Sequence, residues 1–302
     1  MNYLITGGAG FIGTNIAKLL LKEGHTVRSI DNYSGGKMES RVTEGVEYVN
    51  GDIRNMDDLM SAMKGIDGVF HTAAIPRMPY SVEHPQETND NNVTGTLNVL
   101  VAARDSGVKR LVYSASSSAY GNQDIMPLVE TMKPRPESPY GLQKYIGEEY
   151  CRLFSSLYNF ETVALRYFNV YGPYMDPNGG YALVIGKFLR QKKDGEPMTI
   201  CGDGEYYRDY THVEDIARAN YAAMTSQKEV SGEVINIGNH SPYSVNQLVE
   251  IIGGESTNVA ERAGDPRRTD ANISKAKELL DWTPQINLVD GIKELKKEYS
   301  VE

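Results

Sequence analysis

Cysteine is scarce in this sequence, with two residues among 302, and histidine is nearly as rare. Cys151 and Cys201 lie far apart and outside any CxxC pair, so the sequence indicates neither a disulfide framework nor a cysteine-ligated metal. The five histidines do not have the spacing of a metal site either. We therefore expect two free thiols in a reducing compartment and no bound metal.

An excess of basic residues and a long hydrophobic run are missing as well. Asp and Glu number 40 against 31 Lys and Arg, which gives a net charge of −9, and there is no stripe of Lys or Arg. This balance argues against nucleic acid and anionic membranes as main partners. No apolar run has the length of a membrane span, and residues 1–13 show no signal-peptide pattern. We expect a soluble, cytoplasmic protein.

The first half of the chain contains a regular alternation of short β-rich runs and helical patterns. Such alternation is typical of parallel βαβ units, in which helices cover both faces of one sheet. We therefore predict an α/β fold with a Rossmann-like, doubly wound parallel sheet. The expected strands are 3–6, 26–31, 46–52, 68–74, 110–116 and 162–170, and the expected helices are 11–24, 57–65, 92–107 and 140–158.

After Tyr171 the pattern loosens into loops rich in Gly and Pro. We expect strands at 198–204 and 234–238 and helices at 213–224, 244–253 and 288–299. The sequence thus predicts a large domain, residues 1–170, to which a segment at about 202–238 returns. Residues 171–201 and 239–302 are expected to form a smaller C-terminal α/β domain.

A glycine loop, TGGAGFIG, follows the first expected strand and opens the first expected helix. Gly7 allows the tight turn, Gly10 lets backbone amides approach a diphosphate, and Gly13 permits close packing of helix on strand. The helix N-terminus adds positive potential. Asp31 closes the second strand, where its carboxylate can bind an adenosine ribose and repel a 2′-phosphate; the alternative is a turn or cap residue. The loop predicts a dinucleotide site and favours NAD over NADP.

A second constellation follows the fifth strand, which runs into YSASSSAYG. Tyr140 and Lys144 lie four residues apart, so a helix places them on one face. The ammonium is then expected to lower the pKa of the phenol from about 10, which suits a general base. Ser116 can hydrogen-bond the reacting oxygen. The alternative is that Tyr140 packs and Lys144 is solvated.

The sequence resembles the extended short-chain dehydrogenase/reductase family, and within it the NAD-dependent nucleotide-sugar 4-epimerases of the UDP-glucose and UDP-N-acetylglucosamine type. The resemblance spans nearly the whole chain. It rests on the glycine loop, Asp31, HTAA (71–74), NNVTGT (91–96), Ser116, the Tyr140–Lys144 pair and LRYFNVYGP (165–173). The family implies tightly held NAD, a transient 4-keto sugar and a homodimer formed through the helices that start near Asn92 and Tyr140.

The resemblance also implies a set of site residues. Tyr140 takes the proton of the sugar 4-hydroxyl, Ser116 assists it, and Lys144 holds the nicotinamide ribose. The implied NAD-binding residues are Gly7, Gly10, Phe11, Ile12, Gly13, Asp31, Asn32, Asp52, Ile53, Ala73, Ala74, Asn92, Tyr140, Lys144 and Tyr167. The implied substrate-binding residues are Arg77, Ser117, Asn169, Ile200, Arg208, Arg262, Asp265 and Thr269.

Within the substrate set, Asn169 and the guanidiniums of Arg208 and Arg262 are suited to a diphosphate. By resemblance, Asp265 contacts the nucleoside ribose and Ile200 flanks the uracil. Either arginine, taken alone, is also compatible with a surface ion pair.

Three features bear on the reaction and the sugar. Ser116 is followed by Ser117, Ser118, Ala119 and Tyr120, without the carboxylate that sugar dehydratases and decarboxylases carry there, which leaves simple 4-epimerisation. Thr269 is small at the position that resembles the family's size gate, which favours room for an N-acetyl group. Arg77 is compatible with a phosphate, with the carboxylate of a uronic acid or with solvent. The alternatives are therefore a UDP-glucuronate 4-epimerase, an epimerase of another nucleotide sugar, and a non-catalytic NAD-binding regulatory protein.

Overall fold

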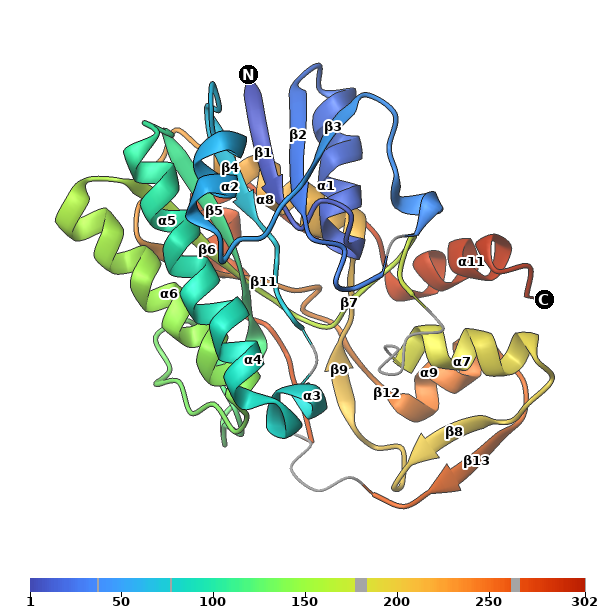
Figure 1. The fold of residues 1–302 in the computed structure, drawn as a ribbon. Coiled ribbons are helices and arrows are strands. Elements are labelled where there is room, and N and C mark those ends of the chain that lie inside the picture. The colour runs from blue at the N-terminus through green and yellow to red at the C-terminus, as the bar shows by residue number, and fades with distance from the viewer. Residues whose placement is uncertain (37, 77, 177–183, 262–266, 302) are drawn as a thin grey trace.

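The computed structural model describes residues 1–36, 38–76, 78–176, 184–261 and 267–301 (Figure 1). Its main body is one sheet with helices on both faces, and the elements follow one another as the alternating pattern predicts. Up to residue 167 they are β1 (Asn2–Thr6), α1 (Phe11–Lys22), β2 (Thr26–Asp31), η1 (Glu39–Arg41), β3 (Val46–Asn50), α2 (Met56–Ala62), β4 (Gly68–His71), α3 (Met78–Glu83), α4 (Pro85–Asn89), η2 (Asp90–Thr94), α5 (Gly95–Asp105), β5 (Arg110–Ser116), η3 (Ser117–Ala119), α6 (Pro139–Tyr158) and β6 (Glu161–Tyr167).

The C-terminal part is built from shorter elements. It contributes one further strand and two helices to the main body, and most of its remaining elements form a smaller layer. They are β7 (Val170–Tyr171), α7 (Val184–Lys193), β8 (Met198–Cys201), β9 (Tyr207–Asp209), β10 (Thr211–His212), α8 (Val213–Thr225), β11 (Glu233–Ile237), β12 (Pro242–Ser244), α9 (Val245–Ile252), β13 (Ser256–Val259), α10 (Ser274–Leu280) and α11 (Leu288–Glu298).

The central sheet has seven parallel strands in the order β11-β6-β5-β4-β1-β2-β3. β1 lies between β2 and β4, so the chain winds outward on one side through β3 and then on the other side through β11. The winding direction reverses between β1 and β4, and in such sheets the carboxyl ends of these two strands form a crevice. The predicted doubly wound fold is confirmed.

Each face of the sheet is buried by helices with an apolar stripe. Ile16 and Leu20 of α1 and Ile216 of α8 belong to the core on one face, which α10 extends. Leu100 of α5 and Phe154 of α6 belong to the core on the other face, together with α2. In Figure 1, α1 and α8 lie behind β1 and β2, and α2, α5 and α6 form a separate group on the opposite side.

A third apolar core holds the C-terminal layer together. Phe188 of α7, Leu248 of α9 and Ile292 of α11 are buried in it, with Ile200 of the parallel β8–β13 pair. The predicted division into domains stays a prediction. β11 does return to the main sheet, beside β6.

The largest local difference from the predicted elements is at residues 162–170, expected as one strand. β6 ends at Tyr167, and the chain turns through Asn169, whose φ is 26°, before β7 begins. A positive φ cannot continue a strand. α6 begins one residue earlier than expected, because the Ser138 side chain caps it by accepting from Gly141 N (3.1 Å) and Pro139 occupies the first turn.

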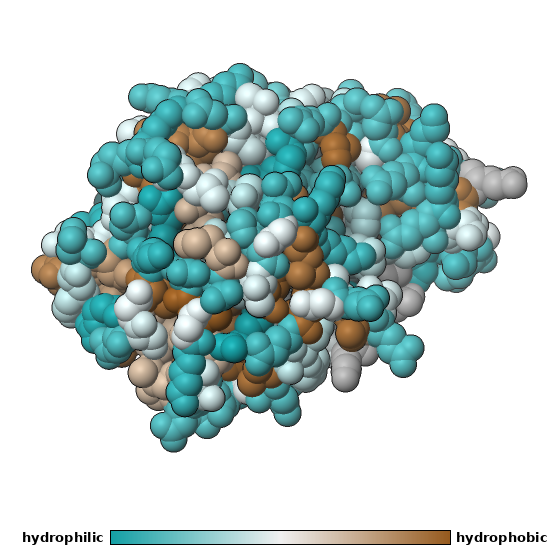
Figure 2. Space-filling view, turned by 90° about the horizontal axis from the view of Figure 1, so that it is seen from above, coloured by the Kyte–Doolittle hydropathy of each residue, from teal (hydrophilic) through white to brown (hydrophobic). Residues whose placement is uncertain are grey.

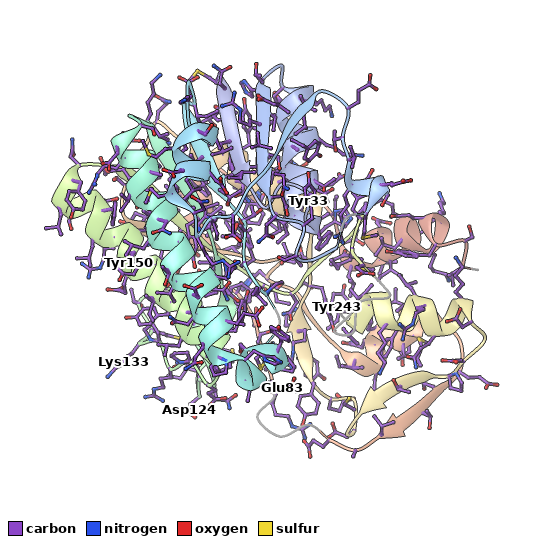
Figure 3. The ribbon with its side chains drawn as sticks, in the orientation of Figure 1. Tyr33, Glu83, Asp124, Lys133, Tyr150 and Tyr243 are labelled. Atoms are coloured by element: carbon purple, nitrogen blue, oxygen red, sulfur yellow. The ribbon has the colours of Figure 1, made fainter. Side chains whose placement is uncertain are left out.

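The face seen from above carries mostly hydrophilic residues, with hydrophobic ones in separate groups (Figure 2). Within the described ranges, no helix combines the length and the apolar character that crossing a bilayer requires. The loop between η3 and α6 runs along the periphery, where Asp124 and Lys133 point away from the body of the molecule (Figure 3).

Candidate active site

A cavity of about 610 Å³ opens at the carboxyl ends of the strands, at the point where the winding direction reverses. The segments that follow β1, β2, β4, β5 and β6 all contribute to its wall. Many residues predicted from the sequence line it: Gly7, Gly10, Phe11, Ile12, Gly13, Asp31, Asn32, Ile53, Ala73, Ala74, Ser116, Ser117, Tyr140, Tyr167, Asn169, Arg208 and Thr269.

The glycine loop is packed so closely that side chains have no space in it. Gly7 has a φ of 73°, and a Cβ there would lie 2.8 Å from the backbone of Ala73. A Cβ on Gly13 would lie 2.4 Å from the Gly7 carbonyl oxygen. The N-terminus of the twelve-residue helix α1 meets the cavity at Phe11. Bare backbone next to a helix N-terminus fits a diphosphate.

Asp31 ends β2 with its carboxylate held by two loops. One oxygen accepts from Ala9 N (3.0 Å) and the other from Tyr33 N (2.8 Å). The carboxylate is therefore fixed beside the glycine loop at the wall of the cavity, and each oxygen keeps a further lone pair. This arrangement fits a hydroxyl-bearing ribose.

Three residues predicted to bind the cofactor, Asp52, Asn92 and Lys144, do not line the cavity. Asp52 accepts from Asn32 Nδ2 (2.9 Å) and pairs with Arg54 (2.7 Å), and the Arg54 hydrogen bond holds the pKa of Asp52 well below its usual range. Asp52 thus orients Asn32, which does line the cavity.

Asn92 is the second of these residues. It is buried, accepts from Ile75 N (2.8 Å) and donates to Gln143 Oε1 (2.9 Å), so it fastens the loop after β4 to α6. The π-helical turn η2 turns the neighbouring Asn91 toward the cavity instead.

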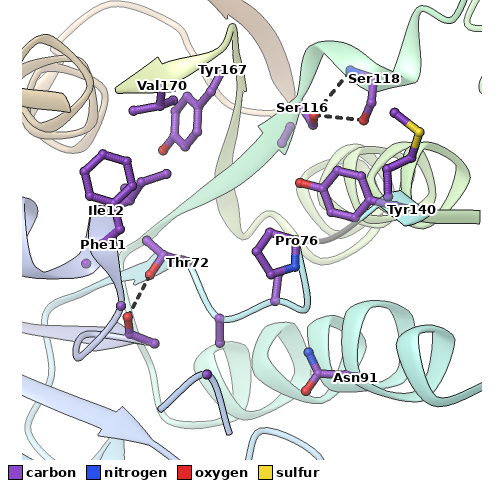
Figure 4. A pocket seen from close by; sticks show the side chains of 18 of the residues that line it. Phe11, Ile12, Thr72, Pro76, Asn91, Ser116, Ser118, Tyr140, Tyr167 and Val170 are labelled. Atoms are coloured by element: carbon purple, nitrogen blue, oxygen red, sulfur yellow. Dashed lines mark hydrogen bonds between the residues drawn. The ribbon is translucent and has the colours of Figure 1, made fainter. Parts of the chain in front are cut away.

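The Tyr140 and Ser116 hydroxyls face one space (Figure 4). Ser116 Oγ accepts from the backbone N of Ser118 (3.2 Å) and from its hydroxyl (2.8 Å). Tyr140 lies in the first turn of α6, where its backbone N donates to Ser81 Oγ (3.1 Å). Figure 4 shows the Tyr140 ring pointing toward Ser116, so two hydroxyl groups from separate elements converge.

The pKa values of the pair differ from the expectation. Burial raises the pKa of Tyr140 to about 12, with an opposing contribution from the Ser116 hydroxyl. Burial lowers the pKa of Lys144 to about 8, and its ammonium donates to the Ser114 carbonyl (2.8 Å). The predicted lowering of the Tyr140 pKa is therefore wrong for the chain itself. Burial disfavours each charged form, and the ammonium is directed to a carbonyl group.

Tyr167 contributes a third phenol to the cavity wall. Its hydroxyl accepts from Asn220 Nδ2 (2.7 Å) and lies 3.1 Å from Ser114 Oγ. Burial raises the Tyr167 pKa to about 12, so this phenol stays protonated at neutral pH. It therefore offers a hydrogen bond without a charge.

Three of the residues expected to bind the substrate, Asn169, Arg208 and Thr269, line the cavity together. Asn169 Nδ2 donates to Thr269 Oγ1 (3.2 Å) and to the Asp209 carbonyl (3.1 Å). The turn that ends β6 brings Asn169 to this position, and the neighbouring Arg208 lines the same wall. Ile200, in contrast, is 4% exposed in the C-terminal core and does not line the cavity. Arg77, Arg262 and Asp265 lie outside the described residues.

Sequence reasoning missed several residues of the cavity wall. Arg41, 7% exposed, lines it and donates from Nε (2.9 Å) and Nη2 (2.7 Å) to the Tyr174 carbonyl. No motif marks Arg41, because it lies in η1, a single short turn between β2 and β3. Glu137 also lines the cavity, and Asn122 Nδ2 donates to both of its oxygens (2.9 and 2.8 Å). Glu137 directly precedes Ser138, the N-cap of α6, and this position in the sequence could have indicated that it lies near Tyr140.

Neither cysteine lines the cavity. Cys151 is buried and Cys201 partly exposed, and both are free. Over the ranges that the structure describes, His, Cys, Asp and Glu side chains form no group of three or more suited to a metal ion.

Comparisons with known proteins agree with the geometry. The family model described as the NAD dependent epimerase/dehydratase family matches residues 3–238. A protein of Methanocaldococcus jannaschii named putative UDP-glucose 4-epimerase is 39% identical over 96% of this chain and 95% of its own length. A UDP-glucuronate 4-epimerase of Thermodesulfobacterium geofontis is 36% identical over 96% of this chain and 94% of its own length.

A solved structure is similar over the whole length. It is the UDP-N-acetylglucosamine 4-epimerase of Methanobrevibacter ruminantium M1 in complex with UDP-N-acetylmuramic acid, 35% identical, with a TM-score of 0.93 and coverage of 99% of this chain and 98% of that one. The glycine loop, the helix N-terminus and the Asp31 carboxylate fit a dinucleotide. The chain therefore belongs to the NAD dependent epimerase/dehydratase family, in the extended branch of the short-chain dehydrogenases/reductases, and is an enzyme with NAD as its cofactor.

Proposed function

We propose that this enzyme is a UDP-sugar 4-epimerase that accepts UDP-N-acetylhexosamines as well as UDP-hexoses. The observation that carries the proposal is the single cavity in which the Tyr140 and Ser116 hydroxyls meet the glycine loop. The relatives named above as 4-epimerases of UDP-sugars support the reaction type. Because these relatives are named for different sugars, the choice of sugar is argued from this chain's own residues.

In the proposed mechanism, NAD supplies the hydride acceptor beside the sugar. Tyr140 takes the proton of the sugar 4-hydroxyl and later returns it, and Ser116 hydrogen-bonds the same oxygen. Lys144, charged at pH values below about 8, favours the phenolate that the proton transfer needs. Asn169 and Arg208 hold the diphosphate, so the 4-keto sugar can turn in the cavity without leaving.

The residues after Ser116 support epimerisation over elimination. Ser117, Ser118, Ala119 and Tyr120 include no carboxylate that could serve as the general acid for loss of water. Both oxygens of the nearby Glu137 accept from Asn122 Nδ2, so this carboxylate is already engaged in hydrogen bonds outside the Ser116 segment.

The sugar proposal depends on Thr269. Its hydroxyl accepts from Asn169 Nδ2 (3.2 Å) and from Asp209 N (3.4 Å), so this small side chain is fixed at the wall. We expect Thr269→Tyr to lower kcat/KM for UDP-N-acetylglucosamine by roughly 10–200-fold and to change that for UDP-glucose much less, because the phenol fills the space of the acetyl group. Steady-state kinetics on both sugars check this. Equal losses on the two sugars would contradict the size argument.

A panel of UDP-glucose, UDP-N-acetylglucosamine and UDP-glucuronate, with the 4-epimers separated by chromatography, tests the proposed function. We expect turnover of the first two. Conversion of UDP-glucuronate alone would establish the uronate 4-epimerase instead. Bound NAD without turnover of any of the three sugars would identify a non-catalytic NAD-binding protein.

We also propose that the chain forms a homodimer through α5 and α6. Leu142, Leu153, Leu157 and Tyr158 expose apolar surface along α6, which supports a covered helix face. Light scattering on the purified protein should give twice the mass of the 33.5 kDa chain, and a monomer mass would refute the proposal.

A further inference from the structure

A buried ion pair lies one helical turn beyond Lys144. Glu148 accepts from Arg166 Nε (2.9 Å) and Nη2 (2.6 Å), and these side chains are 1% and 3% exposed. Arg166 comes from β6, and its guanidinium lies 4.5 Å from the centroid of the Tyr120 ring. Buried ion pairs often contribute little net stability, because desolvation costs about as much as the attraction returns. Net stability therefore does not explain why this ion pair is buried here.

Glu148 and Lys144 are four residues apart on the inward face of α6, and both are buried. Burial lowers the pKa of Lys144 and raises the pKa of Glu148, and the attraction between the ammonium and the carboxylate opposes both shifts. Lys144, Glu148 and Arg166 are thus three buried charged side chains, of which Glu148 is paired with Arg166 and lies one helical turn from Lys144. The Glu148 carboxylate interacts electrostatically with both Arg166 and Lys144.

The other titratable groups around Lys144 are neutral near pH 7. Burial lowers the pKa of His71, on β4, to about 3. It raises the pKa of Tyr113 on β5, whose ring centroid lies 5.0 Å from Lys144 Nζ, and the pKa of Cys151 on α6. Tyr140 and Tyr167, on α6 and β6, have pKa values near 12. Among the described groups, Glu148 is thus the anion that acts on Lys144.

We propose that Glu148, held in place by Arg166, is a positioning residue that keeps the Lys144 ammonium charged in its buried site. This inference rests on the proposed function, in which Lys144 supports proton transfer at Tyr140. Glu148 touches neither the cavity nor Tyr140, so it acts through Lys144. Arg166 in turn keeps Glu148 ionised, because an unpaired carboxylate at this depth would take up a proton.

Glu148→Gln in the NAD-loaded enzyme tests the inference. Loss of the anion leaves two buried cations, so the pKa of Lys144 falls from about 8 by roughly one to three units. Lys144 then loses its charge at lower pH, and the alkaline limb of the pH profile of kcat moves to lower pH by the same amount. Glu148→Asp retains a carboxylate, so its alkaline limb should lie between those of Glu148→Gln and the wild-type enzyme.

Glu149→Gln is the matched control. Glu149 is the next residue of α6, but its side chain is 41% exposed and pairs with Arg152 on the surface (2.8 Å). The same loss of one negative charge there should leave the pH profile of kcat unchanged. An equal shift in both variants would show a general charge effect and overturn the role of Glu148.

A second variant keeps the test decisive if Glu148→Gln does not fold. Replacing both Glu148 and Arg166 by Met removes the pair without leaving an unpaired charge, a change that is often tolerated in protein cores. The alkaline limb should still move to lower pH, since Lys144 has lost its anion. A folded variant with the wild-type limb would show that the pair serves packing alone.

A direct titration separates this inference from the proposed function. With [ε-¹³C]lysine in the NAD-loaded protein, the Lys144 signal, assigned by its loss in Lys144→Arg, reports the pKa without any turnover. A lower pKa in Glu148→Gln supports the inference even if no UDP-sugar is converted. An unchanged pKa overturns it even if the enzyme is a 4-epimerase.

Discussion

Tyr140→Phe should lower kcat on the best UDP-sugar by roughly 10²–10⁴-fold while the purified protein keeps its NAD. Phenylalanine preserves the ring in the first turn of α6 but removes the oxygen that takes the sugar proton. The hydroxyl makes one contact, with Ser116, so its loss should cost about 1 kcal/mol of stability or less. Steady-state kinetics and chromatographic quantification of the released NAD check both parts.

Tyr150→Phe provides the comparison for this substitution. Tyr150 lies on the same helix but outside the cavity wall, so the variant should turn over like the unmodified enzyme (Figure 3). A Tyr140→Phe enzyme with more than about a tenth of normal kcat would remove Tyr140 from the proposed mechanism. Loss of NAD together with activity would assign Tyr140 to cofactor binding instead.

Gly13→Val should prevent NAD binding and lower the melting temperature by roughly 5 °C or more. A Cβ at this position lies 2.4 Å from the Gly7 carbonyl oxygen and 2.7 Å from the Gly8 Cα, and neither backbone atom can move aside without opening the loop. Overpacking of this kind costs about 1–3 kcal/mol and sometimes more. Differential scanning calorimetry and the NAD content of the purified protein measure the two effects.

Gly35→Ala serves as the control for stability. A Cβ on Gly35 meets nothing within 4 Å, so the melting temperature should stay within about 2 °C of the unmodified protein. A Gly13→Val protein with normal NAD content would show that the loop has an alternative packing and would weaken the assignment of the glycine loop to the cofactor.

The sheet and the cofactor end of the site were predictable because their signals are local. Gly7, Gly10 and Gly13 follow a strand directly and open a helix. This local pattern predicts a diphosphate site without reference to distant segments. The α6 face that joins Tyr140 and Lys144 follows from helical spacing alone. The predictions from these patterns required no knowledge of distant segments.

The remaining features depend on contacts between distant segments. Asp52 does not reach the cavity because Arg54 and Asn32 hold it, and Asn92 is turned away by Ile75 and Gln143. Spacing on a helix does not report burial, which is why it predicted the wrong direction for the pKa of Tyr140.

The break between β6 and β7 also limits the distance between Tyr167 and Asn169. Tyr167, on the cofactor side, and Asn169, on the substrate side, are two residues apart, which limits their Cα separation to roughly 7 Å. Tyr167 belongs to the central sheet and is fixed by Ser114 and Asn220. Under the proposed function, the chain itself therefore acts as a covalent spacer between the two ligands.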